Sequence, residues 1–372
     1  MLLANRRWIL AVLYFTGVAS AQDFLDSAVI SMLKSQHVPG AAIAAVQDGK
    51  VLREIVYGDA NLQLHVPVKR TTTFQLASLT KIFTAAALMK LEADGKLNLD
   101  DPVSKYLTGL PKGWSAVNVR ELATHTSGLP DLITSPNKPL TDEELNRTAE
   151  EALKFAESQE IVAPPGMRFQ YDQTNYLLLQ RIIEYISGKS LREFLTTSVM
   201  QSSMPATEWG DARIVISGRS DMYTELYHDR IENAANLFAY PKYLDAAAGL
   251  NSNILDMERF AALLTSGKLL PRVELDRMWE PAKNRGGQIV DVANDLDLRG
   301  VAAPTVGWFY ADNSGGKLPR VFMTGGSATS IMVFTKQNLC IVVLTNLQAK
   351  DDPLPIIERI AREYLPDLKP MF

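Results

Sequence analysis

The chain has 372 residues, of which 47% are hydrophobic and 22% charged, enough for one large domain or two lobes with a substantial core. Its 38 basic and 42 acidic residues give a formal charge of −4 without a basic stripe, which argues against nucleic acid as a partner. The single cysteine, Cys340, cannot form an intrachain disulfide. It lies in an apolar run typical of a buried strand, so we do not expect it to be a nucleophile.

Residues 1–21 have the pattern of a secretory signal. Arg6 and Arg7 supply the basic start, residues 8–18 form a short apolar stretch, and Ala19-Ser20-Ala21 fits the small-residue rule for cleavage. The apolar stretch falls short of the roughly 20 residues that span a bilayer, and no later segment resembles a membrane span. We therefore expect cleavage after Ala21 and a secreted or periplasmic protein. An uncleaved anchor and twin-arginine export are the alternatives.

The N-terminal part predicts a helix, a hairpin and a second helix. The first helix is expected at 23–35, and apolar runs follow at 41–46 and 51–56. Asp48-Gly49 between these runs is a strong hairpin signal. The second helix is expected at 82–91, a run of strong helix formers. It is expected to stop at Asp94-Gly95, where glycine supplies a left-handed cap.

The middle of the chain is predicted to be helical and its end to return to strands. Thr141 and Glu144 form a capping box that predicts a helix reaching about residue 157. Further helices are expected at 119–124, 176–186, 191–199, 253–264 and 354–364, and strands at 306–310, 320–323, 330–334 and 339–344. Strands at both ends predict an α/β fold in which an antiparallel sheet is flanked by helices. A mostly helical lobe is inserted at roughly 96–205, with a cleft between the lobes.

Four S-x-x-K patterns occur in the chain, and only one has a context suited to catalysis. They are Ser31/Lys34, Ser78/Lys81, Ser135/Lys138 and Ser314/Lys317. The first lies in an amphipathic run, the third precedes a proline turn, and the fourth precedes Gly315-Gly316. Ser78 alone follows an extended stretch and leads into a strong helix.

The spacing of Ser78 and Lys81 indicates an acyl-enzyme nucleophile. Residues i and i+3 share a helix face, so the lysine amine can approach the serine oxygen. A serine next to an amine base is a recipe for nucleophilic catalysis, and S-x-x-K is a signature of β-lactamases and penicillin-binding proteins. The alternative interpretation is that Ser78 is a plain helix N-cap.

Further motifs follow in order along the chain: Val38-Pro39-Gly40, 101–107, 122–131 with His125-Thr126-Ser127-Gly128, 164–171 ending at Tyr171, Gly249-Leu250, and Thr324-Gly325-Gly326. With Ser78 and Lys81, they resemble the serine β-lactamase-related hydrolases. This family includes class C β-lactamases, D-Ala-D-Ala carboxypeptidases and related esterases. The resemblance covers nearly all of residues 22–372 and implies a β-lactamase/transpeptidase-like fold with its active site in the cleft.

The resemblance also implies a role for individual residues. Ser78 takes the place of the nucleophile, Lys81 of its amine partner and Tyr171 of the tyrosine base. The backbone N–H groups of Ser78 and Gly326 take the place of the oxyanion hole, and Thr324 and Gly325 lie on the same substrate-binding stretch. A core tyrosine is the alternative for Tyr171. His125 stands where the family has a structural turn, so we do not expect it to act as a catalytic base.

Two residues depart from the family pattern. The tyrosine is usually followed two residues later by asparagine, whereas this chain has Gln173; Asn175 is the alternative source of the amide. Where the family has Lys or His before Thr-Gly, this chain has Met323, which offers no charge to a substrate carboxylate. An ester, or an amide without a nearby anionic group, suits Met323 better than a penicillin.

We therefore expect an exported serine hydrolase that uses a Ser-Lys-Tyr acyl-enzyme mechanism on a small ester, amide or peptide-like substrate. The alternatives are a β-lactamase or D-Ala-D-Ala peptidase acting on cell-wall-like substrates, and a catalytically silent ligand-binding homologue. No cofactor is expected, and the histidine spacings indicate no metal site. Nothing in the sequence indicates the oligomeric state.

Overall fold

The computed structural model describes residues 21–134, 140–211, 213–226, 230–233, 239–326, 328–348 and 353–371. The signal-like residues 1–20 lie outside the described residues, and so does the third S-x-x-K pattern at Ser135. The first described helix, α1 (Ala21–Ser35), begins at the residue after which cleavage is expected. Cleavage and export therefore stay predictions.

Within the described part of the chain, eight strands form one antiparallel sheet in the order β3-β2-β1-β13-β12-β11-β10-β9. Their bounds are β1 (Gly40–Gln47), β2 (Lys50–Asn61), β3 (Val66–Pro67), β9 (Val301–Pro304), β10 (Phe309–Asp312), β11 (Arg320–Gly325), β12 (Thr329–Phe334) and β13 (Leu339–Thr345). Strand β1 pairs with β13 and so joins the two ends of the chain, which confirms the predicted sheet.

The hairpin of β1 and β2 and the central strand β13 form as predicted. Asp48 and Gly49 both have positive φ values, +48° and +78°, as a two-residue type I′ hairpin turn requires. Every residue of β13 is buried, including Cys340, because both faces of the central strands are covered by helices. The run of apolar β-branched residues in β13 is typical of such a strand.

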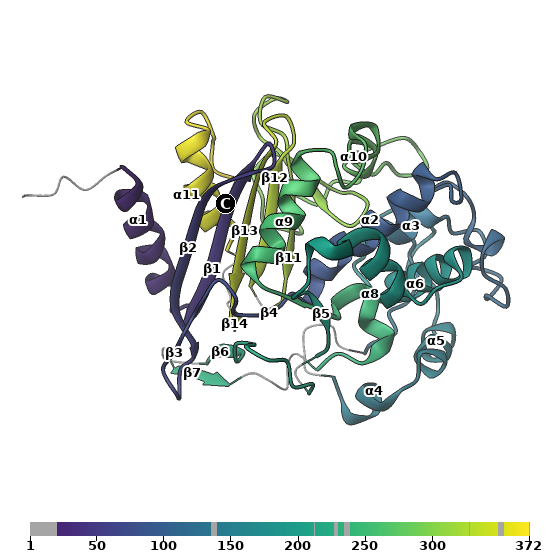
Figure 1. Cartoon of the computed structure of the whole chain (residues 1–372). Helices are drawn as coiled ribbons and strands as arrows, with labels where there is room; N and C mark the ends of the chain where they lie inside the picture. Colours follow the sequence, from purple (N-terminus) through teal and green to yellow (C-terminus); the bar gives the residue numbers. More distant parts are fainter. Residues whose placement is uncertain are drawn as a thin grey trace, which may run out of the picture.

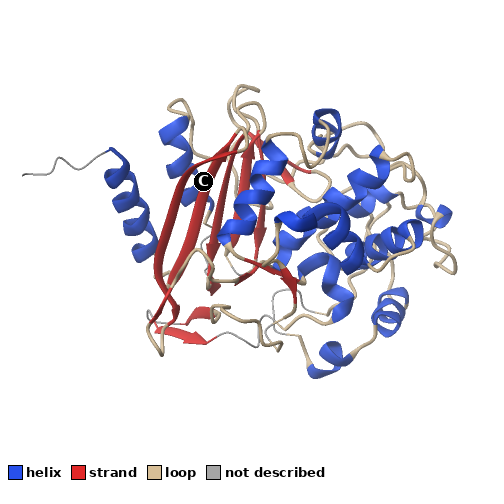
Figure 2. Ribbon diagram, viewed as in Figure 1, coloured by secondary structure: helices blue, strands red, loops and turns tan. Residues whose placement is uncertain are grey.

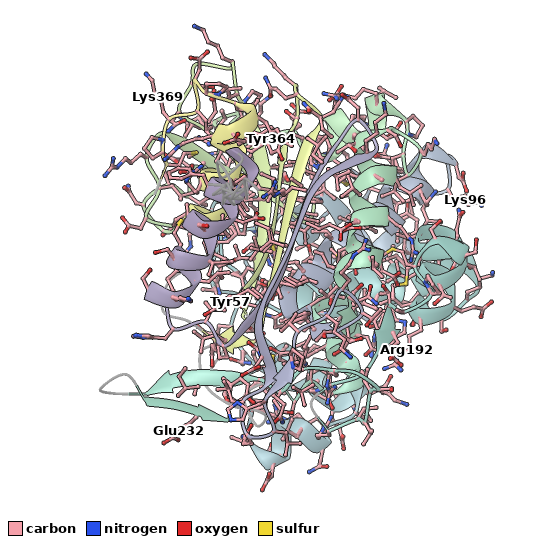
Figure 3. All side chains as sticks on the ribbon, turned by 60° about the vertical axis from the view of Figure 1, so that its left-hand side comes forward. Tyr57, Lys96, Arg192, Glu232, Tyr364 and Lys369 are labelled. Carbon is pink, nitrogen blue, oxygen red and sulfur yellow. The ribbon has the colours of Figure 1, made fainter. Side chains whose placement is uncertain are left out.

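Helices lie on both faces of the sheet (Figure 1). Figure 3 shows α1 and α11 (Leu354–Tyr364) on one side of the strands and α9 (Ile254–Thr265) on the other. A group of helices gathers beside the sheet (Figure 2). These helices are α2 (Thr80–Ala93), α3 (Val119–Ala123), α4 (Asp142–Asn146), α5 (Ala149–Glu157), α6 (Thr174–Ser187), α7 (Leu191–Phe194), α8 (Asp245–Ala248) and α10 (Arg272–Met278).

The described residues also form two small three-stranded sheets. Strand β8 (Leu250–Ser252) pairs with β4 (Phe74–Gln75) and β5 (Glu208–Trp209) just before Ser78. The other sheet joins β6 (Tyr223–Leu226), β7 (Arg230–Asn233) and β14 (Leu347–Gln348). None of the described helices is long and apolar enough to cross a bilayer.

Three predicted elements were wrong in detail. The helix expected to reach residue 157 is two helices, α4 and α5, because Thr148 caps the second one through a further capping box with Glu151. The helix expected at 191–199 is α-helical only in α7 and continues as a π-helix, Leu195–Met200. The strand expected at 306–310 begins only at Phe309, since residues 305–308 form the tip of the β9–β10 hairpin.

Helix α2 carries the candidate catalytic lysine through the centre of the molecule. Eleven of its 14 residues are buried, so it is apolar on nearly every face, as expected for a helix inside a core. It ends at Asp94, and Gly95 follows with φ +69°, which confirms the predicted left-handed stop. A central, rigid helix is a firm support for a reacting side chain.

A buried ion pair ties β11 to α11 and supports a stability prediction. Arg320 Nη1 lies 3.2 Å from Glu358 Oε1, and their side chains are 0% and 3% exposed. Glu358→Ala leaves the buried guanidinium with the neutral amide of Asn313 but without its carboxylate partner, so we expect a loss of about 3–5 kcal/mol in the free energy of unfolding. Urea unfolding measures it. The exposed Glu363 on the same helix gives the control, Glu363→Ala, expected within about 0.5 kcal/mol of the wild type.

A double substitution separates the cost of the unpaired charge from the loss of packing. Replacing both partners by apolar residues, Arg320→Met with Glu358→Leu, removes the uncompensated charge and is expected to cost less than Glu358→Ala alone. A double variant that is less stable than the single one would contradict this account.

Candidate active site

Ser78 lies in a short 3-10 turn, Ala77–Leu79, that leads directly into α2. The preceding residue, Ala77, has φ +46°, a left-handed conformation that residues with a Cβ rarely adopt. Such local strain persists where the surrounding structure holds it, commonly at functional sites. The cap residue of α2 is Leu79, without a side-chain hydrogen bond, so the interpretation of Ser78 as a plain N-cap is wrong.

The Ser78 oxygen has two close polar neighbours. The hydroxyl of Tyr171 donates to Ser78 Oγ at 2.8 Å, and Lys81 Nζ donates to it at 3.3 Å. Lys81 is fully buried and also donates to Gln173 Oε1 at 3.2 Å and to the carbonyl oxygen of Ala247 at 3.1 Å. The amine thus lies within hydrogen-bond distance of three oxygen atoms. The structure thus brings together Ser78, Lys81, Tyr171 and Gln173.

Aromatic rings surround the lysine. Its Nζ lies 4.9 Å from the ring centroids of both Tyr171 and Tyr176, within the range of cation–π attraction. The ring of His125 lies against the same two tyrosines, with centroid distances of 4.3 Å to Tyr171 and 5.2 Å to Tyr176. Burial, and secondarily the charge of Lys81, holds the pKa of His125 well below its usual value. His125 is therefore a neutral ring packed behind the site.

Gln173, and not Asn175, supplies the amide next to the lysine. The Asn175 side chain accepts from Ser127 Oγ at 2.6 Å and donates to Asp172 Oδ2 at 2.6 Å. Burial raises the pKa of Asp172 well above its usual value. Asn175 therefore acts in the scaffold beneath Tyr171.

The end of β11 lies beside the residues that precede Ser78. Thr329 Oγ1 donates to the carbonyl oxygen of Leu76 at 3.1 Å, and a Cβ on Gly325 would lie 2.4 Å from that same oxygen. Gly325 is thus required for this close approach. Thr324 is half-buried and Gly326 is exposed. The oxyanion role of the backbone N–H groups of Ser78 and Gly326 stays a prediction.

Met323 lies in β11 opposite Ile331 and is 3% exposed. It lines a small cavity together with Lys81 and Tyr171. Its thioether brings no charge to this side of the site. The departure from the family at Met323 therefore changes a residue that lines a cavity next to the candidate catalytic groups.

Two further groups support the site and were not anticipated. The carbonyl of Ala247 carries no sequence signal, because any residue supplies one. Asp131 Oδ1 accepts the backbone N–H groups of Gln173 at 3.1 Å and Ile133 at 3.2 Å. Asp131 belongs to one of the motifs that carry the family resemblance, but its carboxylate was assigned no role. It fixes the backbone of the residue whose side chain contacts Lys81.

The buried carboxyl of Asp131 makes stability depend on pH. Burial raises its pKa to about 6, above the ordinary value of an unfolded chain. The neutral form is thus favoured in the folded protein; this stabilisation is full below about pH 4 and is lost as the pH rises through about 6. Asp131→Asn removes the ionisation. We expect the unfolding free energy of this variant relative to the wild type to rise by up to about 3 kcal/mol between about pH 4 and pH 7.

Urea unfolding of both proteins across that pH range measures this difference. The other titrating groups are common to both chains and largely cancel, and the exposed Asp142 offers a matched control in Asp142→Asn. A difference between Asp131→Asn and the wild type that does not change with pH would contradict the prediction.

In the described ranges, no group of three or more His, Cys, Asp or Glu side chains is placed to hold a metal ion. The chemistry proposed below uses the hydroxyl, amine and phenol around Ser78.

Comparison with known proteins identifies the family. The chain matches the family model described as Beta-lactamase over residues 25–364. It is 32% identical over 182 residues to "Protein flp" of Staphylococcus aureus (strain COL), which covers 48% of this chain and 36% of that protein. The matched region thus spans about a third of this curated relative.

Solved structures share the fold. The octameric penicillin-binding protein homologue from Pyrococcus abyssi superposes with a TM-score of 0.78 at 23% identity, covering 93% of this chain and 78% of that one. A D-stereospecific amidohydrolase from Streptomyces sp. gives a TM-score of 0.73 at 22% identity, covering 90% and 97%. These likenesses confirm the predicted β-lactamase/transpeptidase-like fold. With the family match across nearly all of the described residues, the chain belongs to the beta-lactamase family.

Proposed function

We propose that this protein is a serine hydrolase that transfers an acyl group from an ester or amide first to Ser78 and then to water. One observation carries the proposal: Ser78 Oγ lies within hydrogen-bond reach of both Tyr171 Oη, at 2.8 Å, and Lys81 Nζ, at 3.3 Å. A hydroxyl flanked by groups that can accept and return its proton is the arrangement that nucleophilic catalysis needs. Membership of the beta-lactamase family supports the same chemistry.

In the proposed reaction, the Lys81–Tyr171 pair starts as a neutral amine beside a phenol, so it can take up one proton. Ser78 Oγ bonds to the substrate carbonyl carbon and its proton passes to this pair. The tetrahedral intermediate collapses, the bond to the leaving group breaks, and the leaving group takes up that proton. Water then attacks the acyl carbon and the pair accepts a proton from it. The bond between Ser78 Oγ and the acyl carbon breaks, Ser78 takes up that proton, and the carboxylic acid leaves. Backbone N–H groups at Ser78 and Gly326 are the proposed donors to the oxyanion.

Met323 supports a substrate without a carboxylate near the reacting carbonyl. A penicillin carries such a carboxylate, and a buried thioether at this place offers it neither charge nor hydrogen bond. A neutral ester or amide loses no interaction when Met323 stands where the family has Lys or His. Export is proposed on the pattern of residues 1–21 alone.

Covalent labelling tests the proposal. The full chain is treated with a fluorophosphonate probe and the modified peptide is mapped by mass spectrometry; we expect modification of Ser78. Ser31, which has the same spacing to a lysine on the exposed side of α1, serves as an internal control and should remain unmodified. Label on another residue, or no label together with tight non-covalent retention of a ligand, would overturn the proposal in favour of a silent binding homologue.

Substrate preference is tested separately. We expect p-nitrophenyl esters to be hydrolysed with a higher kcat/KM than a chromogenic cephalosporin. The reverse order would point to a β-lactamase and contradict the interpretation of Met323.

A further inference from the structure

A small cavity is lined in part by the candidate catalytic groups Lys81 and Tyr171 and by Met323. His125 and the tip of the β9–β10 hairpin, which carries Thr305 and Trp308, line it as well. The cavity volume of about 10 Å³ is near the lower limit that accommodates a single water molecule.

The hairpin tip is firmly placed. The backbone N–H of Thr305 donates to the carbonyl of Trp308 at 2.8 Å, and the N–H of Gly307 donates to the carbonyl of Ala123 at 3.1 Å. Gly307 has φ +75°, and a Cβ there would lie 2.5 Å from the Cβ of Ala85 in α2. The chain therefore needs glycine to bring this tip against the helix that carries Lys81.

Three polar side-chain atoms of cavity-lining residues lack partners among the residues that the structure describes. They are His125 Nε2, Thr305 Oγ1 and Trp308 Nε1. The three residues are 5%, 1% and 2% exposed, so bulk water does not reach them. Buried polar groups in native proteins are nearly always paired, with protein or with ordered water. Three residues with an unpaired polar atom line one water-sized space, and this coincidence is the specific signal.

The hydrogen bonds of His125 fix which of its nitrogens carries the proton. Nδ1 faces two donors, the backbone N–H of Asp172 at 3.3 Å and Asn175 Nδ2 at 3.2 Å, so it acts as an acceptor. A neutral imidazole that accepts at Nδ1 carries its hydrogen on Nε2. That Nε2–H needs an acceptor, and so does the indole N–H of Trp308, which can only donate.

We propose that this cavity is a binding site for one ordered water molecule, which accepts from His125 Nε2 and Trp308 Nε1 and donates to Thr305 Oγ1. Two bonds accepted and one donated match the usual three hydrogen bonds of a buried water. The water completes the support of His125, and His125 in turn is a positioning residue for Tyr171, against whose ring it packs at 4.3 Å.

The functional part of this inference rests on the proposed function. Tyr171 Oη reaches Ser78 Oγ only while its ring stays in place, and the His125 ring packs against that ring at an interplanar angle of 30°. A His125 ring that lost its water-mediated bond would be free to tilt, and the phenol would move with it. The expected effect is on kcat, since His125 acts through the position of the Tyr171 phenol.

Two neighbouring tryptophans provide a matched pair of variants. The rings of Trp308 and Trp279 lie edge to face, with 6.3 Å between their centroids. In both residues the indole N–H has no partner in the described part of the chain. Only Trp308 lines the cavity. Trp308→Phe removes the donor and keeps most of the ring, whereas Trp279→Phe makes the same chemical change outside the cavity.

The kinetic test measures hydrolysis of a p-nitrophenyl ester. We expect Trp308→Phe and Thr305→Val each to lower kcat about threefold to tenfold with KM unchanged. Thr305→Ser, which keeps the hydroxyl, should restore the wild-type kcat, and Trp279→Phe should leave it unchanged. A purely structural role for Thr305 would not distinguish serine from valine in this way. Equal kcat for all four variants would overturn the positioning role.

A crystal structure of the full chain at high resolution tests the water itself, whatever the enzyme's activity. Density for one water within hydrogen-bond distance of His125 Nε2, Thr305 Oγ1 and Trp308 Nε1 is expected. A direct bond between Thr305 and His125 with no water between them would overturn the site. Failure of fluorophosphonate labelling at Ser78 would refute the proposed function and leave this crystallographic result standing, so the two failures are distinguishable.

Discussion

Replacing Ser78 with alanine is expected to lower kcat/KM for a p-nitrophenyl ester by at least about 10³-fold and to abolish covalent labelling. The substitution removes the oxygen that both Tyr171 and Lys81 contact, at 2.8 Å and 3.3 Å. Without it the acyl group loses its proposed acceptor. The helix should persist, because Ser78 does not cap α2.

The comparison needs a variant with the same change outside the site. Ser31→Ala alters a serine three residues before a lysine on an exposed helix position, and we expect wild-type activity from it. Thermal unfolding of both variants checks that any loss at Ser78 is chemical. Undiminished labelling of Ser78→Ala would remove the basis of the enzymatic interpretation.

Much of the fold could be predicted because its signals are local. The Asp48-Gly49 turn, the apolar run of β13 and the Gly95 stop of α2 each depend on a few adjacent residues, and each was confirmed. The errors arose because such local signals do not show contacts with distant parts of the chain. Residues 306–310 are apolar enough to suggest a strand, yet Gly307 adopts a positive φ against α2, a contact that the sequence around it does not display.

In the candidate site, too, the sequence reveals the local contacts but not the contacts between residues far apart in the chain. The i, i+3 spacing of Ser78 and Lys81 is a helical pattern visible in the sequence. Tyr171 lies 93 residues from Ser78 in the chain, and Ala247 lies 166 residues from Lys81. No periodicity joins residues so far apart, so only the family resemblance could name Tyr171, and nothing could name the Ala247 carbonyl. The supporting cavity at Thr305 and Trp308 depends on packing alone.

Lys81→Met is expected to lower the acylation rate by about 10²- to 10⁴-fold, the range that a positioned proton-transfer group contributes. Methionine nearly preserves the volume of this fully buried side chain, so the packing of α2 should survive while the amine is lost. Stopped-flow measurement of the p-nitrophenolate burst isolates acylation from deacylation. Lys90→Met, near the end of the same helix, is the matched control and should leave the burst unchanged.

The same burst measurement can separate the lysine from the phenol. Tyr171→Phe keeps the ring against His125 and Lys81 but removes the hydroxyl that donates to Ser78. If the two groups hand one proton along a single route, the double variant should lose little more than the worse single variant, because residues that act as a unit are strongly non-additive. Independent losses that multiply would instead mean two separate roles, with the ammonium acting by its charge and the phenol by its proton. An unchanged burst rate in Lys81→Met would exclude both arrangements, since each needs the amine one helical turn from Ser78.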